Sequence, residues 1–85
     1  MSAKVDTEYP IAQQLDACGL NCPLPLLKAK QALNRLQPGE VLRVVATDAG
    51  SVRDFKAFTD QSGDQLLVST EQLGQFIYLI RKGCK

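Results

Sequence analysis

The sequence predicts an α+β fold, a two-layer βαβαββ sandwich with two helices packed on one face of a four-stranded mixed sheet. Apolar residues recur at helical spacing in two segments, and four short segments are rich in apolar and β-branched residues. They alternate as strand, helix, strand, helix, strand, strand, and the simplest packing of that order is one helix layer on one sheet. With 85 residues and 45% hydrophobic content, the chain suits a single domain over residues 1–85.

The first half of the chain contains a short strand and the clearest helix. Residues 1–10 are polar and end at a proline, so we expect a flexible start. The segment IAQQLDA, residues 11–17, is a short strand with imperfect alternation. The segment PLPLLKAKQALNRLQPG, residues 23–39, is a helix that the final Pro-Gly pair ends. Its apolar face comprises Leu26, Ala29, Leu33 and Leu36.

The second half predicts one buried strand, a second helix and a hairpin. The segment EVLRVVAT, residues 40–47, is apolar on both faces, as in a mostly buried strand. Ser51, followed three residues later by Asp54, resembles a capping box that begins the second helix. The runs QLLVSTE and FIYLIRK, residues 65–71 and 76–82, predict a hairpin. The apolar stripe expected on the second helix is Val52, Phe55 and Phe58.

Composition and charge exclude several classes of function. Ten basic and nine acidic residues give a net charge of +1, so we expect weak or no direct nucleic acid binding and no membrane binding. No apolar run approaches the roughly 20 residues of a membrane span. The first residues lack a secretory signal, which predicts a cytoplasmic protein with reduced thiols. The chain has no histidine, which excludes a Cys-His pair.

The stretch CGLNCPLP, residues 18–25, is the candidate functional motif. Pro23 suits the first position of a helix because its missing N–H would be unpaired there, which places Cys22 at the N-cap. Pro25 is tolerated in the same turn. Gly19 lets the chain turn sharply into this stiff helix start. The motif therefore predicts a thiol presented at the tip of a rigid helix.

The helix dipole favours a thiolate at this position, but the prolines remove two backbone donors. The Leu24 amide is the one nearby donor left, so we expect a moderately lowered pKa for the Cys22 thiol. Neutral packing of Cys22 is the alternative interpretation. We expect Cys18 to be packed and unreactive, and Cys84 to be incidental next to the chain end. A Cys18–Cys22 disulfide would close a very short loop.

No metal or cofactor is expected. Structural zinc takes four protein ligands, usually in two pairs. Cys18 and Cys22 match one such pair, but no second pair and no histidine follow.

The segment LDACGLNCPLPLLKAKQAL resembles the signature of the TusA family of small sulfur-carrier proteins, also called SirA-like. The likeness continues in LQPGEVLRVVATD, in RDF and in YLIRKG, so it covers about residues 13–83. It implies the same two-layer fold and a persulfide carrier rather than a complete catalyst. The residues that match the family's Gly-Leu-x-Cys-Pro-x-Pro run are Gly19, Leu20, Cys22, Pro23 and Pro25.

The resemblance also implies roles for individual residues. Cys22 would accept the sulfur, while Gly19, Pro23 and Pro25 would shape its loop. Cys18 stands where the family more often has a small residue without a thiol, which makes it a candidate resolving thiol. Two further residues, with no role that we derive from the sequence, match frequently acidic family positions: Asp48 and Asp54.

Three functions compete. The first is a sulfur carrier that takes sulfane sulfur from a cysteine desulfurase or another donor and relays it to an acceptor protein, foremost for tRNA 2-thiouridine formation. The second is an RNA- or protein-binding regulatory module in which Phe76 and Tyr78 stack bases. The third is a thiol-redox protein that uses Cys18 and Cys22. The sequence does not choose the donor, the acceptor, the oligomeric state or the pathway, among them molybdenum-cofactor synthesis and sulfur oxidation.

A carrier must meet its partners near the reactive thiol. The basic side chains that we expect to contact partners lie on the first helix and at the end of the last strand: Lys28, Lys30, Arg35, Arg81 and Lys82.

Overall fold

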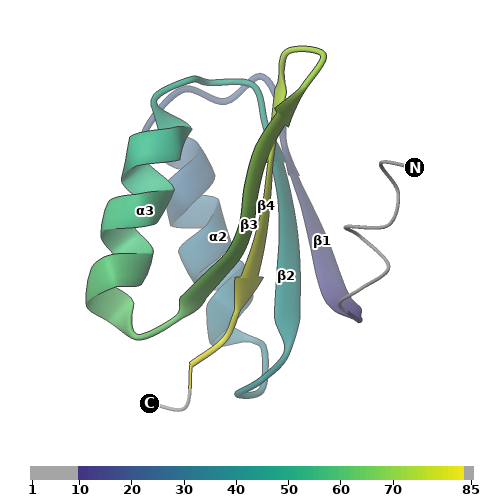
Figure 1. Cartoon of the computed structure of the whole chain (residues 1–85), viewed down its shortest axis with the longest axis vertical. Helices are drawn as coiled ribbons and strands as arrows, with labels where there is room; N and C mark the ends of the chain where they lie inside the picture. The colour runs from purple at the N-terminus through teal and green to yellow at the C-terminus, as the bar shows by residue number, and fades with distance from the viewer. Residues whose placement is uncertain (1–9, 84–85) are drawn as a thin grey trace.

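The computed structural model describes residues 10–83, and in them it confirms the predicted two-layer fold. Two helices lie side by side on one face of a twisted four-stranded sheet (Figure 1). None of the helices in residues 10–83 is long and apolar enough to cross a membrane. The elements are β1 (Ile11–Ala17), α2 (Leu24–Asn34), β2 (Val41–Ala46), α3 (Ser51–Ser62), β3 (Gln65–Gln72) and β4 (Gln75–Arg81).

The sheet has the strand order β1-β2-β4-β3, so the last strand lies between the two preceding ones. β1 and β2 are parallel because α2 carries the chain back across the sheet between them. β4 is antiparallel to both β2 and β3. In register, Ala17 pairs with Ala46, and Ala46 pairs with Phe76. The C-terminal ends of β1 and β2 therefore lie side by side at one end of the sheet, and both helices begin at that end.

The core lies between the sheet and the helices and centres on β2 and β4, the two middle strands. Phe55 of α3 stacks on Tyr78 of β4 with ring centroids 4.5 Å apart. Both rings are fully buried, and Phe76 packs partly buried against the same cluster. Neither Phe76 nor Tyr78 is therefore placed to stack bases on an open sheet face, which removes the basis of that prediction. The predicted face of the first helix packs on this core.

The helix starts differ from the predictions in detail. α2 begins at Leu24 with Pro23 as its N-cap, one residue later than expected. α3 begins at Ser51 after Gly50. The predicted capping box is wrong. The Ser51 hydroxyl donates to the Asp48 carbonyl at 2.7 Å, and the Asp54 carboxylate contacts Cys22 instead of the start of its own helix. Val52 is 42% exposed and lies off the apolar stripe.

The hairpin forms where predicted, with Leu73 and Gly74 in the turn. Both residues have positive φ, 51° and 80°, as a two-residue hairpin turn requires. Leu73 is fully exposed at this tip.

Candidate functional site

The site begins where β1 leads into α2. Gly19 has φ 81°, a left-handed conformation that favours glycine, and so the predicted sharp turn is present. Its N–H donates to Thr47 Oγ1 at 2.9 Å. Thr47 directly follows β2, so this bond ties the loop to the neighbouring strand. Thr47 could not be identified from the sequence, since no local pattern marks a contact across 28 residues.

Cys22 lies in the turn that precedes α2, is exposed and is a free thiol. The Cys22–Pro23 peptide bond is cis. The Leu24 N–H donates to the Asn21 carbonyl at 2.8 Å, so it is not the sulfur's donor. The sequence predicted that the Leu24 amide would stabilise a Cys22 thiolate. In the structure this amide does not do so, because it donates to the Asn21 carbonyl.

The thiol of Cys22 instead donates a hydrogen bond to Asp54 Oδ2, in the first turn of α3. Because a carboxylate stabilises the protonated thiol, this bond is the main reason that the pKa of Cys22 is raised above its usual 9.0. Desolvation and the negative charges of Asp54 and Asp48 raise this pKa further, and Arg53 opposes them. The sequence-based expectation of a lowered thiol pKa is wrong.

Asp48, in the loop between β2 and α3, is the second carboxylate of the site. Its Oδ2 is buried and has no hydrogen-bond partner among residues 10–83. A Cβ atom at Gly50 would lie 2.9 Å from this oxygen and 3.6 Å from Cys22 Cβ, so a glycine allows the loop to approach the thiol. From the sequence alone Asp48 and Asp54 have no derivable role. In the structure Asp48 lies in the loop after β2 and Asp54 lies in the first turn of α3.

Cys18 lies on the other side of the sheet from the helices. Its Sγ accepts from Gln75 Nε2 at 3.7 Å, and its backbone N–H donates to Asp16 Oδ1 at 3.0 Å. The interaction of the thiol itself with the Asp16 carboxylate, which favours the protonated sulfur, is the main reason that the pKa of Cys18 is raised. Cys18 and Cys22 are both free thiols, but Cys18 is half-buried whereas Cys22 is exposed. Cys84 lies outside the described residues. The Cys18 sulfur borders a hollow of about 260 Å³, which is lined by Gln14, Asp16, Cys18, Arg43, Val45 and Gln75.

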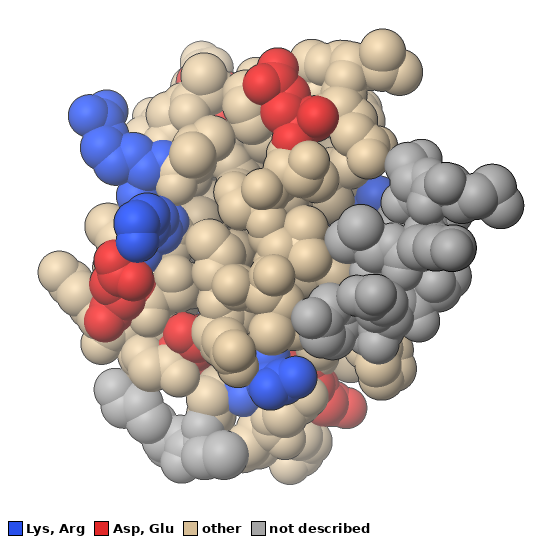
Figure 2. All heavy atoms as spheres, in the orientation of Figure 1, with Lys and Arg blue, Asp and Glu red and all other residues tan. Residues whose placement is uncertain are grey.

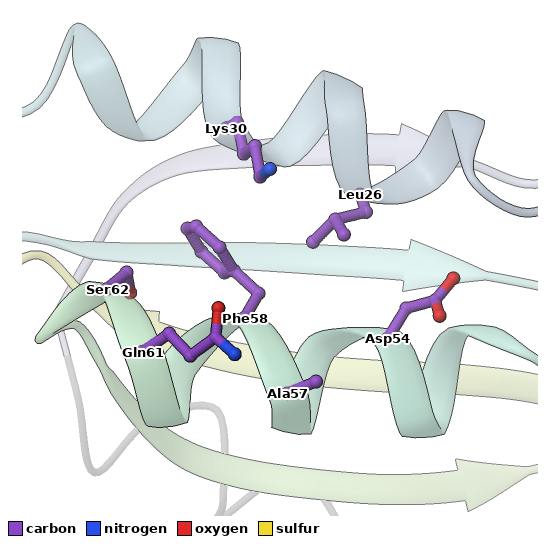
Figure 3. Close-up of a pocket in the computed structure, with 7 residues that line it drawn as sticks. All are labelled: Leu26, Lys30, Asp54, Ala57, Phe58, Gln61 and Ser62. Carbon is purple, nitrogen blue, oxygen red and sulfur yellow. The ribbon is translucent and has the colours of Figure 1, made fainter.

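A groove of about 440 Å³ runs between α2 and α3 (Figure 3). Asp54 lies at the end of the groove nearest the helix starts. Lys30 reaches across from α2, with its Nζ 5.4 Å from the centre of the Phe58 ring. The groove therefore opens beside the carboxylate that contacts Cys22.

The predicted docking residues are spread from the start of α2 to the far end of the molecule. Lys28 and Lys30 are exposed on the first two turns of α2, and Lys30 lines both the groove that contains Asp54 and a second hollow that contains Lys82. Arg35 is the C-cap of α2, and Lys82 Nζ donates to the Leu33 carbonyl at 2.8 Å beside it. Arg81 donates to Gln65 Oε1 at 3.2 Å at the same far end. An 11-residue helix spans roughly 16 Å, so Arg35, Arg81 and Lys82 are not brought together with Cys22.

Within residues 10–83, no group of three or more Cys, Asp or Glu side chains is arranged to hold a metal ion. The site consists of one exposed thiol, two carboxylates and backbone groups.

A crystal structure of a SirA-like protein from Desulfitobacterium hafniense matches with a TM-score of 0.75 and 29% identity, over 84% of this chain and 97% of that one. The fold is thus the SirA-like sandwich. The family model of sulfurtransferase TusA matches residues 13–82, and the chain belongs to this family.

Two relatives carry the name sulfur carrier protein TusA. The one from Allochromatium vinosum is 57% identical over 70 residues, which are 82% of this chain and 92% of the relative. The one from Pseudomonas fluorescens is 41% identical over 75 residues, 88% of this chain and 90% of the relative. A sulfur carrier has a sulfur donor and a sulfur acceptor as partners.

Proposed function

We propose that this protein accepts sulfane sulfur on Cys22 as a persulfide and relays it to a downstream acceptor. The observation that carries the proposal is the free, exposed Cys22 thiol at the rigid start of α2, where a partner's active site can reach it. Membership of the TusA family supports the same role. The donor is a cysteine desulfurase or another protein that presents a persulfide.

The loading step is a transfer between sulfurs. The Cys22 thiol loses its proton to solvent, and the thiolate attacks the terminal sulfur of the donor persulfide. A new S–S bond forms on Cys22 while the donor's S–S bond breaks, and the donor cysteine leaves as a thiolate. The step needs no outside oxidant or reductant. It also needs no histidine, and the chain contains no histidine.

The sulfur is destined, in our proposal, for tRNA 2-thiouridine formation through an acceptor protein in the reducing cytoplasm. The face in Figure 2 supports an indirect route, because its basic groups are few, are bordered by acidic ones and form no extended basic patch. The net charge of +1 supports it as well, since direct tRNA binding depends on phosphate neutralisation by clustered basic residues.

Mass spectrometry after incubation with a cysteine desulfurase and cysteine tests the proposal. The wild-type protein should gain one sulfur atom, and Cys22→Ser should gain none. Because Cys22 is exposed, the serine variant should keep its fold, which circular dichroism checks. Cys84→Ser is the matched control and should load fully. Sulfur on a folded Cys22→Ser protein would refute the assignment of Cys22.

A further inference from the structure

The charges around Cys22 are unusual for a thiol that must react. Asp54, on α3, accepts the hydrogen bond of the thiol. Asp48, in the loop before α3, adds a second negative charge, and its buried Oδ2 has no hydrogen-bond partner in residues 10–83. Arg53, also on α3, is the cation that acts on the sulfur in the opposite sense. The sulfur therefore lies in a locally negative environment.

This environment treats the two states of the side chain differently. An unloaded thiol has a proton to donate and is stabilised by the Asp54 carboxylate. A persulfide is more acidic than a thiol, so near neutral pH it is an anion with no proton to donate. Contact between that anion and Asp54 would place like charges together, which disfavours it. The outward side is solvent, because Cys22 is exposed.

We propose that Asp54 is a positioning residue that distinguishes unloaded from loaded Cys22, holding the protonated thiol against the start of α3 and turning the persulfide anion outward toward the acceptor. The loaded half of this proposal rests on the proposed function. The unloaded half depends only on the hydrogen bond between Cys22 and Asp54. The carboxylate thus restrains the thiol between transfers and favours presentation of the sulfur once it is loaded.

The test compares wild type with Asp54→Asn, which keeps the shape and removes the charge. Asp60→Asn is the matched control, because Asp60 lies on the same helix and pairs with Lys56 at 3.4 Å, away from Cys22. The measurement is the alkylation rate of Cys22 as a function of pH, in a Cys18→Ser, Cys84→Ser background. Asp54→Asn should move the inflection to lower pH and raise the rate near neutral pH by several-fold to about tenfold. Asp60→Asn should match wild type.

Rescue and stability controls separate this role from a merely structural one. Asp54→Glu should return the profile toward that of wild type. Loss of a first-turn acid weakens the helix dipole interaction slightly, so thermal melts are recorded for each variant. Should the asparagine variant fail to fold, Asp54→Gln, which also removes the charge and has a higher helix propensity, replaces it. Coincident profiles for wild type and the folded Asp54 variant would overturn the proposal.

A second arm uses protein loaded chemically with polysulfide. The persulfide of Asp54→Asn should be alkylated more slowly than that of wild type, because the amide can donate to the anion and hold it inward. Equal rates would overturn the outward turn of the loaded sulfur. If desulfurase loads no sulfur onto wild type, the proposed function fails, whereas the profile of the unloaded thiol still tests Asp54.

Discussion

Tyr78 donates a buried hydrogen bond to Ser51, with 2.6 Å between the two hydroxyl oxygens. The direction follows from Ser51, whose single hydroxyl proton is already donated to the Asp48 carbonyl. The bond joins the central strand β4 to the first residue of α3. Asp54 lies one turn further along α3, so this buried pair fixes the base of the helix that carries the carboxylate in contact with Cys22.

Removal of the Ser51 hydroxyl should destabilise the protein more than removal of the Tyr78 hydroxyl. Ser51→Ala leaves the buried Tyr78 phenol without an acceptor, at a cost of about 1–3 kcal/mol in the free energy of unfolding. Tyr78→Phe loses one hydrogen bond, about 1 kcal/mol, while Ser51 keeps its bond to Asp48. Urea denaturation measures both. Thr70→Val is the control, because Thr70 is exposed on β3 and pairs in register with Ile77, not with Tyr78. The reverse order of the two variants would contradict the assigned donor.

Alkaline pH should weaken the fold through Tyr78. Burial is the main cause that raises the pKa of Tyr78 above its usual 10.0. The phenol therefore ionises first in the unfolded chain, so its contribution to stability is complete below about pH 10 and is lost as pH rises through the higher folded pKa. Unfolding midpoints should fall over that range, and Tyr78→Phe should reduce the fall. An unchanged pH dependence in the variant would exclude Tyr78 as its source.

The order of elements was predictable from the sequence because it depends on local patterns. The period of 3.6 in residues 23–39 and the run of β-branched residues in 40–47 each reflect burial of one face or both. The place of β4 between β2 and β3 was not predictable in this way. The position of β4 depends on its pairing with β2, which is distant in the sequence, and no local pattern in either strand specifies that pairing.

The exposed position of the Cys22 thiol at the start of a helix was predictable from the sequence, but the residues that contact it in space were not. Gly19 and the prolines mark the loop because their backbone preferences are local. The contact between Asp54 and Cys22 joins residues 32 positions apart, and the pattern Ser51-x-x-Asp54 suggested a competing local use. The tertiary contact prevails because the Ser51 side chain is buried against Tyr78, which leaves Asp54 to face the thiol.

Charge reversal at Lys28 should slow sulfur loading, whereas charge reversal at Arg81 should not. Lys28 is exposed near the start of α2, on the same end of the protein as Cys22. Arg81 lies at the opposite end, bonded to Gln65. A donor that reaches Cys22 would therefore lie close to Lys28 and far from Arg81. Loss of the electrostatic attraction between Lys28 and the donor should act mainly on the association rate. We expect a several-fold slower loading for Lys28→Glu at low salt, measured as initial rates with a desulfurase.

Salt and stability provide the controls for this pair of variants. The difference between Lys28→Glu and wild type should shrink as salt is added, because exposed charges are screened. Both variants should retain the unfolding free energy of wild type to within about 0.5 kcal/mol. Equal loading rates for the two variants would show that Lys28 does not take part in donor docking.

Cys18→Ser should load sulfur at nearly the wild-type rate. Cys18 faces the side of the sheet away from the helices, where Gln75 and Asp16 contact it. Its thiol is half-buried, which limits the access of a donor's active site, whereas the raised pKa is common to both thiols and does not separate them. Cys22 is exposed on the helix side, next to Asp54. The two sulfurs therefore belong to different surfaces, which argues against a resolving thiol at position 18.

Peptide mapping by mass spectrometry after loading decides between these two thiols. In wild type, the added sulfur should be found on the peptide that retains Cys22, with Cys18 unmodified. In Cys18→Ser, the amount of added sulfur and its position should be unchanged. Under mild oxidation without donor, the Cys18–Cys22 disulfide should form no faster than disulfides between separate molecules. Loss of loading in a folded Cys18→Ser protein, or rapid formation of that disulfide, would show that Cys18 takes part in the relay after all.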